Sequence, residues 1–228
     1  MTMRSAPLRL IGAVIGILAT TCAMHAASGT LTWDATEAQI KATDGWQSTY
    51  TSMYWLVGAS GNATYPWRYV YEFTIPSLRT NLSHLIIEVS ESFTQDDLNY
   101  TGGEIGWHSS ANGNPGMPGS VFGLNIPDSA FTLTDNGDGS ATYAFSFFST
   151  RSPVWGDFWA KDGTADQGQT EVWACNAGFE LHDSNDGAHI MVPDTKELPP
   201  PNDAPEPAAW ILLLSASALS AAVRRRRG

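Results

Sequence analysis

Aromatic side chains are the most numerous residues that could contact a ligand. Residues 28–207 contain 8 Trp, 7 Tyr and 9 Phe. Exposed Trp and Tyr rings can stack on sugar rings, while neighbouring Asp, Asn and Gln side chains bond sugar hydroxyls. Trp107, Trp155 and Trp159 adjoin predicted loops and are therefore the candidate carbohydrate-binding residues. The alternative is that these rings fill a β-sheet core, as aromatic side chains commonly do.

Calcium is the one cofactor that the sequence suggests. Gly137 and Gly187 occupy the third oxygen position of the loop pattern D-x-[DN]-x-[DN]-G, so turn geometry is the favoured explanation of the oxygen-rich clusters around them. His182 and His189 flank the second cluster, but no HExxH motif or cysteine pair supports a transition-metal site. The oxygen ligands that could hold calcium are Asp135, Asn136 and Asp138 in one turn, and Asp183, Asn185 and Asp186 in the other.

Enzymatic cleavage of a glycan needs two carboxylates that face one cleft. Glu72 and Glu88 would share a face only if their strands pair in register, and a solvated sheet face also explains their polar positions. No G-x-S-x-G, P-loop or dinucleotide fingerprint is present, and Cys175 has no evident His partner. The sequence thus predicts a non-catalytic protein, with a secreted glycan-active hydrolase or lyase of β-sandwich fold as the alternative.

The elements that must position these residues are short strands. Apolar and polar residues alternate over 69–75, 85–89 and 143–147, which is typical of strands with one buried face. Asn-Gly and Asp-Gly within 134–140 predict a hairpin, and 109–119 is expected to be a surface loop. Residues 35–42 could form one or two helical turns. Further strands are expected near 30–33, 50–57, 131–134, 154–160 and 171–181. This pattern predicts an all-β protein with a single antiparallel β-sandwich, jelly-roll-like, over residues 28–192.

Charge excludes one class of partner. The chain has a formal net charge of −11, but six of its twelve basic residues lie at the two ends, and residues 28–206 carry −17. Such a domain repels a phosphate backbone, so nucleic-acid binding is not expected.

The first 27 residues have the parts of a secretory signal peptide. Arg4 and Arg9 precede a ten-residue apolar run at 10–19, which is too short for a permanent membrane span. Small residues follow, and cleavage is expected after Ala26 or Ala27; a lipoprotein site at Cys22 is the alternative. Export would leave Cys175 as the sole cysteine, so no internal disulfide is expected.

The last 36 residues change character abruptly. Residues 193–207 contain six prolines and four acidic residues, which predicts an extended, solvated linker. Residues 208–223 have no charge and would span about 24 Å as a helix, against roughly 30 Å of hydrocarbon that Trp210 and flanking arginines can help to match. Residues 224–228 form an arginine-rich tail, which the positive-inside rule places in the cytoplasm. A single transmembrane helix is therefore predicted at 208–223.

Three features of the C-terminal 36 residues together resemble a known sorting signal. The tripeptide Pro205, Glu206 and Pro207, the short apolar helix and the final Arg224, Arg225, Arg226 and Arg227 resemble the PEP-CTERM sorting signal. That resemblance implies processing by the membrane transpeptidase exosortase, transient anchoring in the inner membrane, and delivery to the surface or extracellular matrix of a Gram-negative, exopolysaccharide-producing cell. Some ice-binding proteins carry the same tail, which says nothing about ice. Residues 153–163 are also similar to β-rich domains of other PEP-CTERM proteins.

These expectations combine into one hypothesis. The chain is expected to be an exported, non-catalytic surface or biofilm-matrix protein that binds exopolysaccharide, with exosortase and the membrane as its partners during sorting.

Overall fold

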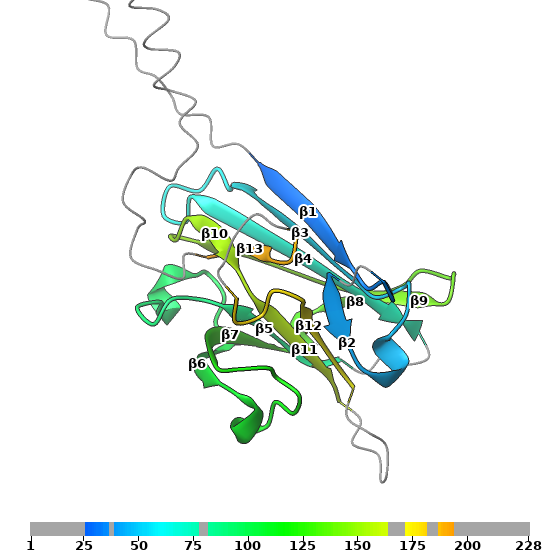
Figure 1. Ribbon diagram of the computed structural model, residues 1–228. Helices are drawn as coiled ribbons and strands as arrows, with labels where there is room; N and C mark the ends of the chain where they lie inside the picture. Colours follow the sequence, from blue (N-terminus) through cyan, green and yellow to red (C-terminus); the bar gives the residue numbers. More distant parts are fainter. Residues whose placement is uncertain (1–25, 37–38, 78–81, 164–171, 182–186, 194–228) are drawn as a thin grey trace, which may run out of the picture.

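Alternating burial along the chain organises the protein into antiparallel β-sheets, as the sequence pattern predicts. The computed structural model describes residues 26–36, 39–77, 82–163, 172–181 and 187–193. Within these ranges, all strands pair with antiparallel neighbours, and Figure 1 shows the two large sheets as separate layers. The described residues contain no helix long and apolar enough to cross a membrane.

Five strands form the first sheet, in which every neighbouring pair is antiparallel. In spatial order they are β1 (Ala27–Thr32), β3 (Ser52–Ala59), β4 (Trp67–Pro76), β9 (Ser140–Ser149) and β8 (Thr132–Asp135). The β8–β9 hairpin pairs Thr134 with Thr142, so the turn predicted at 134–140 is confirmed.

Six strands form the second sheet, and two more form a separate ribbon. The six, in spatial order, are β2 (Ile40–Ala42), β12 (Trp173–Asn176), β11 (Phe158–Asp162), β5 (Leu82–Glu88), β7 (Val121–Pro127) and β6 (Glu104–His108). The ribbon pairs β10 (Pro153–Gly156) with β13 (Ile190–Pro193). Short 3₁₀ turns occur at η1 (Asp44–Trp46), η3 (Gln95–Asp97), η4 (Ser110–Asn112) and η5 (Asp128–Ala130).

The main core lies between the two large sheets. Phe73 of β4 and Phe158 of β11 meet across it with ring centroids 6.1 Å apart, and Trp46 packs edge-on against Phe73 at 5.3 Å. Tyr71 is fully buried, which raises its pKa well above the usual value, and its hydroxyl donates to the Met191 carbonyl at 2.9 Å. This bond satisfies a buried phenol and also ties β4 to the ribbon.

A second apolar cluster covers the outer face of the six-stranded sheet. Trp159 and Ile86 point outward from neighbouring strands, and Met117 from the segment at 109–120 packs over them. His84 Nε2 lies 2.9 Å from Asn114 Oδ1, which holds this segment to β5. Residues 109–119, expected to be a surface loop, therefore also cover sheet residues, and the Asn114 side chain is buried between this segment and β5.

Three local expectations differ from the structure. Residues 40–42 are strand β2 and not a helical turn, because Ile40 and Ala42 are buried around exposed Lys41 and pair with β12. The expected strand 154–160 is divided at Asp157, where the chain passes from the ribbon to the second sheet. Strand β12 covers only four residues of 171–181, since a turn closed by Leu181 N donating to Gly178 O follows it.

The connections resemble a jelly roll only in part. The chain crosses between the large sheets from β4 to β5 and from β7 to β8, as in Greek-key sandwiches. The β3–β4 and β8–β9 hairpins keep consecutive strands within one sheet, and the β10–β13 ribbon is separate from both large sheets. The all-β, antiparallel class is confirmed, while the jelly-roll order stays a prediction.

A bidentate ion pair fastens the 90–99 connection to the end of β9. Arg151 Nε lies 2.9 Å from Asp97 Oδ1, and Arg151 Nη2 donates to Asp97 Oδ2 at 3.1 Å. Burial raises the pKa of Asp97, but hydrogen bonds from Arg151, Thr150 and Thr94 outweigh it and bring that pKa down to about 2. The carboxylate thus stabilises the folded state while it is ionised.

We predict that Asp97→Asn lowers the free energy of unfolding by about 1–2 kcal/mol at pH 7, the range for partly exposed charged hydrogen bonds. Because the pKa of Asp97 is depressed in the folded state, its contribution is present above about pH 4 and is lost as pH falls towards 2. Urea titrations at pH 7 and pH 2.5 measure it. A wild-type-to-variant difference that stays equal at both pH values contradicts the prediction.

Candidate functional site

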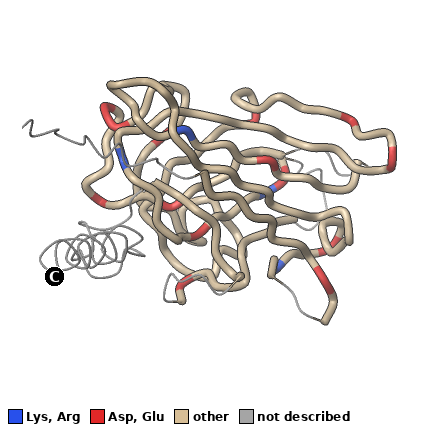
Figure 2. The backbone as a smooth tube through the Cα atoms, turned by 90° about the horizontal axis from the view of Figure 1, so that it is seen from above, with Lys and Arg blue, Asp and Glu red and all other residues tan. Residues whose placement is uncertain are grey.

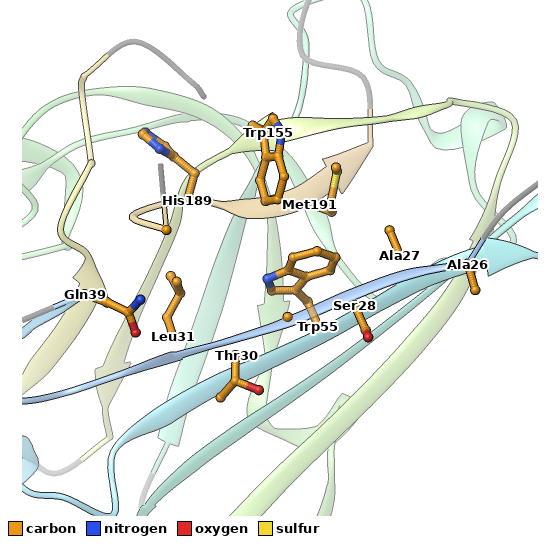
Figure 3. A pocket seen from close by; sticks show the side chains of 12 residues that line it. Ala26, Ala27, Ser28, Thr30, Leu31, Gln39, Trp55, Trp155, His189 and Met191 are labelled. Atoms are coloured by element: carbon orange, nitrogen blue, oxygen red, sulfur yellow. The ribbon is translucent and has the colours of Figure 1, made fainter. Parts of the chain in front are cut away.

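A groove of about 570 Å³ lies between the edge strand β1 and the β10–β13 ribbon. Figure 3 shows its walls: β1 and Trp55 of β3 on one side, Trp155 of β10 and Met191 of β13 on the other. Residues 26–31 and residues 187, 189 and 191 all border it, so the two ends of the described chain meet here. The groove is therefore a product of tertiary folding.

Two tryptophans, one from each wall of the groove, contact one another and form its aromatic surface. The Trp55 and Trp155 rings contact edge to face, with centroids 5.5 Å apart and planes at 86°, and they point toward one another in Figure 3. Trp55 is buried and Trp155 is half-buried, so Trp155 presents the accessible ring. Gly29 pairs with Trp55 across the strands, and a Cβ at Gly29 would lie 2.5 Å from Trp55 Cζ2. Glycine is thus required for this ring to lie flat on β1.

Polar groups line the other end of the groove. Gln39 Oε1 accepts from the backbone N of Thr32 at 3.2 Å, which fixes the side-chain amide beside β1. His189 is 1% exposed, and its Nε2 lies 3.2 Å from the Gly178 carbonyl. Ser28 and Thr30 border the groove from β1, but their side chains point away from Trp155 in Figure 3. An aromatic face beside an amide side chain and the main chain of an edge strand is an arrangement that suits a sugar ligand.

A buried carboxylate holds the walls of this groove in place. Asp157 Oδ1 accepts from Asn176 Nδ2 at 2.7 Å, and Asp157 Oδ2 accepts from the backbone N of Glu180 at 3.1 Å. His189 Nε2 lies 3.8 Å from Asp157 Oδ1, and Glu88 Oε2 accepts from Asp157 N at 2.9 Å. The network joins β5, β12 and β13 where the chain leaves the ribbon, so it positions both β10 and His189.

The three tryptophans that were predicted to contact sugar lie in different surroundings. Trp155 lines the groove. Trp107 is 55% exposed on the edge strand β6 and contacts Phe122 edge-on at 5.8 Å, outside the groove. Trp159 is 0% exposed beneath the 109–120 segment, so the prediction that it contacts a ligand is wrong. Its Nε1 is buried with no hydrogen-bond partner among the described residues.

In the candidate calcium turn that the structure describes, the side-chain groups make hydrogen bonds within the turn itself. Asp135 Oδ1 accepts from Gly137 N at 3.0 Å, and Asn136 Nδ2 donates to Ser140 Oγ at 2.9 Å. Hydrogen bonds from the Ser140 hydroxyl and backbone N lower the pKa of Asp138. Turn geometry therefore explains these residues without a metal ion. Within the described residues, no group of three or more His, Cys, Asp or Glu side chains is placed to hold one.

Several predicted site residues lie outside the described ranges. These are the second calcium cluster with its neighbouring histidine, the sorting tripeptide and the terminal arginines: Asp183, Asn185, Asp186, His182, Pro205, Glu206, Pro207 and Arg224, Arg225, Arg226 and Arg227. The signal peptide at 1–27, apart from its last two residues, and the expected helix at 208–223 also lie outside them.

The structure separates the carboxylates considered for hydrolysis. Glu72 lies on β4 in the five-stranded sheet, whereas Glu88 lies on β5 in the six-stranded sheet and binds Asp157 N. Cys175 is buried, which raises the pKa of its thiol to about 12, and it packs in the outer apolar cluster. These three residues are therefore not brought into one cleft.

Sequence reasoning missed most of the groove. Trp55 lies in an alternating strand and therefore has the pattern of a core residue, and Gln39 belongs to no motif. The one available signal was Trp155, a large ring beside a predicted loop. Comparison with known proteins finds no matching family model, no matching curated protein and no matching solved structure.

We predict that Asp157→Ala lowers the free energy of unfolding by about 2–4 kcal/mol, because Asn176 Nδ2 and Glu180 N lose a buried acceptor. Asp138→Ala, in the exposed hairpin turn, is the control and should lower the free energy of unfolding clearly less than Asp157→Ala does. Urea unfolding followed by circular dichroism measures both variants. Equal losses for the two would mean that the Asp157 network does not stabilise the fold.

Proposed function

We propose that this chain is an exported, non-catalytic surface or extracellular-matrix protein that binds polysaccharide through the groove beside β1. The observation that carries the proposal is the groove itself, where the accessible Trp155 ring lies in one groove with the Gln39 amide and the main chain of β1. A volume of about 570 Å³ is within the usual range of ligand sites.

The arrangement supports recognition rather than cleavage. Sugar binding needs a ring face and groups that bond hydroxyls, which Trp155, the Gln39 amide and the main chain of β1 supply. Hydrolysis would need two facing carboxylates, and Glu72 and Glu88 belong to different sheets. A binding role is therefore the better use of the residues present.

Export and sorting are the second part of the proposal, and the sequence ends support them. The signal peptide at 1–27 would direct secretion. The linker at 193–207, the apolar segment at 208–223 and the arginine tail would form a PEP-CTERM-type signal for an exosortase, with brief anchoring in the inner membrane. Cleavage after Ala26 or Ala27 would occur at the first residues of β1, so the new amino end would border the groove.

We predict that the chain is retarded by its producer's exopolysaccharide in affinity gel electrophoresis, and that Trp155→Ala weakens binding by about tenfold or more, since buried aromatic contacts dominate such sites. Trp107→Ala is the matched control, because Trp107 is exposed but lies outside the groove. Loss of binding in the Trp107 variant alone would assign binding to β6 and reject the groove.

Sorting has a separate test. Mass spectrometry of the secreted protein should find no peptide from 208–228, because processing near the tripeptide removes the apolar segment. Replacement of Pro205, Glu206 and Pro207 by alanine should leave the intact C-terminus in the membrane fraction. An intact 208–228 segment in the secreted wild-type protein would refute exosortase processing.

A further inference from the structure

We propose that the polysaccharide bound in the groove is uncharged, and that acidic polysaccharides are excluded from it. This inference rests on the proposed function, since it names the class of glycan taken by the same groove. It depends on three observations: the charge of the groove lining, the positions of the cationic side chains, and the net charge of the domain.

The described lining of the groove offers no cationic partner for a carboxylate or sulfate group. None of the twelve described residues that line it is Lys, Arg, Asp or Glu. Its one titratable side chain, His189, is 1% exposed and is held between the Gly178 carbonyl and Asp157. Sugar acids are commonly bound by arginine or lysine, which supply charged hydrogen bonds. An acidic sugar would enter this groove without compensation for its charge.

The cationic side chains of the described residues lie elsewhere. Arg151 binds Asp97 and the Ser92 carbonyl, and Lys161 Nζ donates to the Gly113 carbonyl at 3.3 Å. Lys41 lies on β2 opposite Cys175. Arg68 borders a separate hollow of about 440 Å³ with Tyr100 and Phe145. An acidic ligand that bound the protein would therefore be expected at Arg68.

The field of the whole domain acts in the same direction. Residues 28–192 include five Lys and Arg against nineteen Asp and Glu, a net charge of −14. Figure 2 shows the acidic positions spread around the molecule, with few basic positions among them. Such a domain repels a polyanion at long range, and salt screens that repulsion beyond about 8–10 Å. The net charge of the domain at long range and the lack of cations in the described groove lining thus both disfavour an acidic polymer.

The groups present suit a hydroxyl-rich, neutral chain. Among the described strands, β1 pairs only with β3, so main-chain groups on its other edge border the groove without a strand partner among the described residues. Six consecutive residues of this segment, 26–31, line it. Main-chain amides and carbonyls and the Gln39 amide can each bond a sugar hydroxyl, while Trp155 covers a ring face. None of these contacts depends on charge.

The test is affinity electrophoresis of the full chain in non-ionic detergent, through gels containing one polymer each. Uncharged probes are dextran, hydroxyethylcellulose and galactomannan; acidic probes are alginate and polygalacturonate. We expect retardation by at least one uncharged polymer, unchanged between about 20 mM and 300 mM NaCl, and lost in Trp155→Ala. The acidic polymers should not retard the protein at either salt concentration.

Other results overturn the inference in distinguishable ways. Retardation by an acidic polymer that is lost in Arg68→Ala but not in Trp155→Ala would leave glycan binding standing and move it out of the groove. Retardation by an acidic polymer that is lost in Trp155→Ala would keep the groove and reject the uncharged class. Failure of every polymer, including the producer's own, would reject the proposed function together with this inference.

Discussion

The buried Asp157 carboxylate is the constraint on which the groove and its surroundings depend. It lies where the chain leaves β10 and enters β11, and it binds groups from two further segments, Asn176 and Glu180. A carboxylate in this position is costly unless every oxygen is paired, so the segments that supply the donors must come together in one arrangement. That arrangement also places His189 and Trp155, the upper wall of the groove.

The groove is continuous with the hydrophobic core. Trp55 belongs to the main core cluster and at the same time forms the groove floor under Trp155. Tyr71 reaches from the same core to the Met191 carbonyl in the ribbon. The aromatic surface offered to a ligand is therefore held by the packing that stabilises the sandwich, and it needs little ordering when a ligand binds.

The domain has few cationic side chains and many acidic ones, and this imbalance affects both its fold and its interactions. Two of the described cations have structural tasks: Arg151 closes the 90–99 connection on Asp97, and Lys161 contacts the segment over the outer face of the second sheet. Residues 28–192 carry a net charge of −14, which disfavours the approach of a polyanion.

Local sequence determined the strands and turns, because period-two alternation and Asn-Gly or Asp-Gly turns act over a few residues; β4, β9 and the 134–140 hairpin follow from it. Tertiary structure decided which rings face solvent. Trp159 has the same local signals as Trp155, but the 109–120 segment covers it. The groove joins residues about 160 positions apart, from Ser28 to His189, and no local pattern encodes the meeting of segments so distant in the chain.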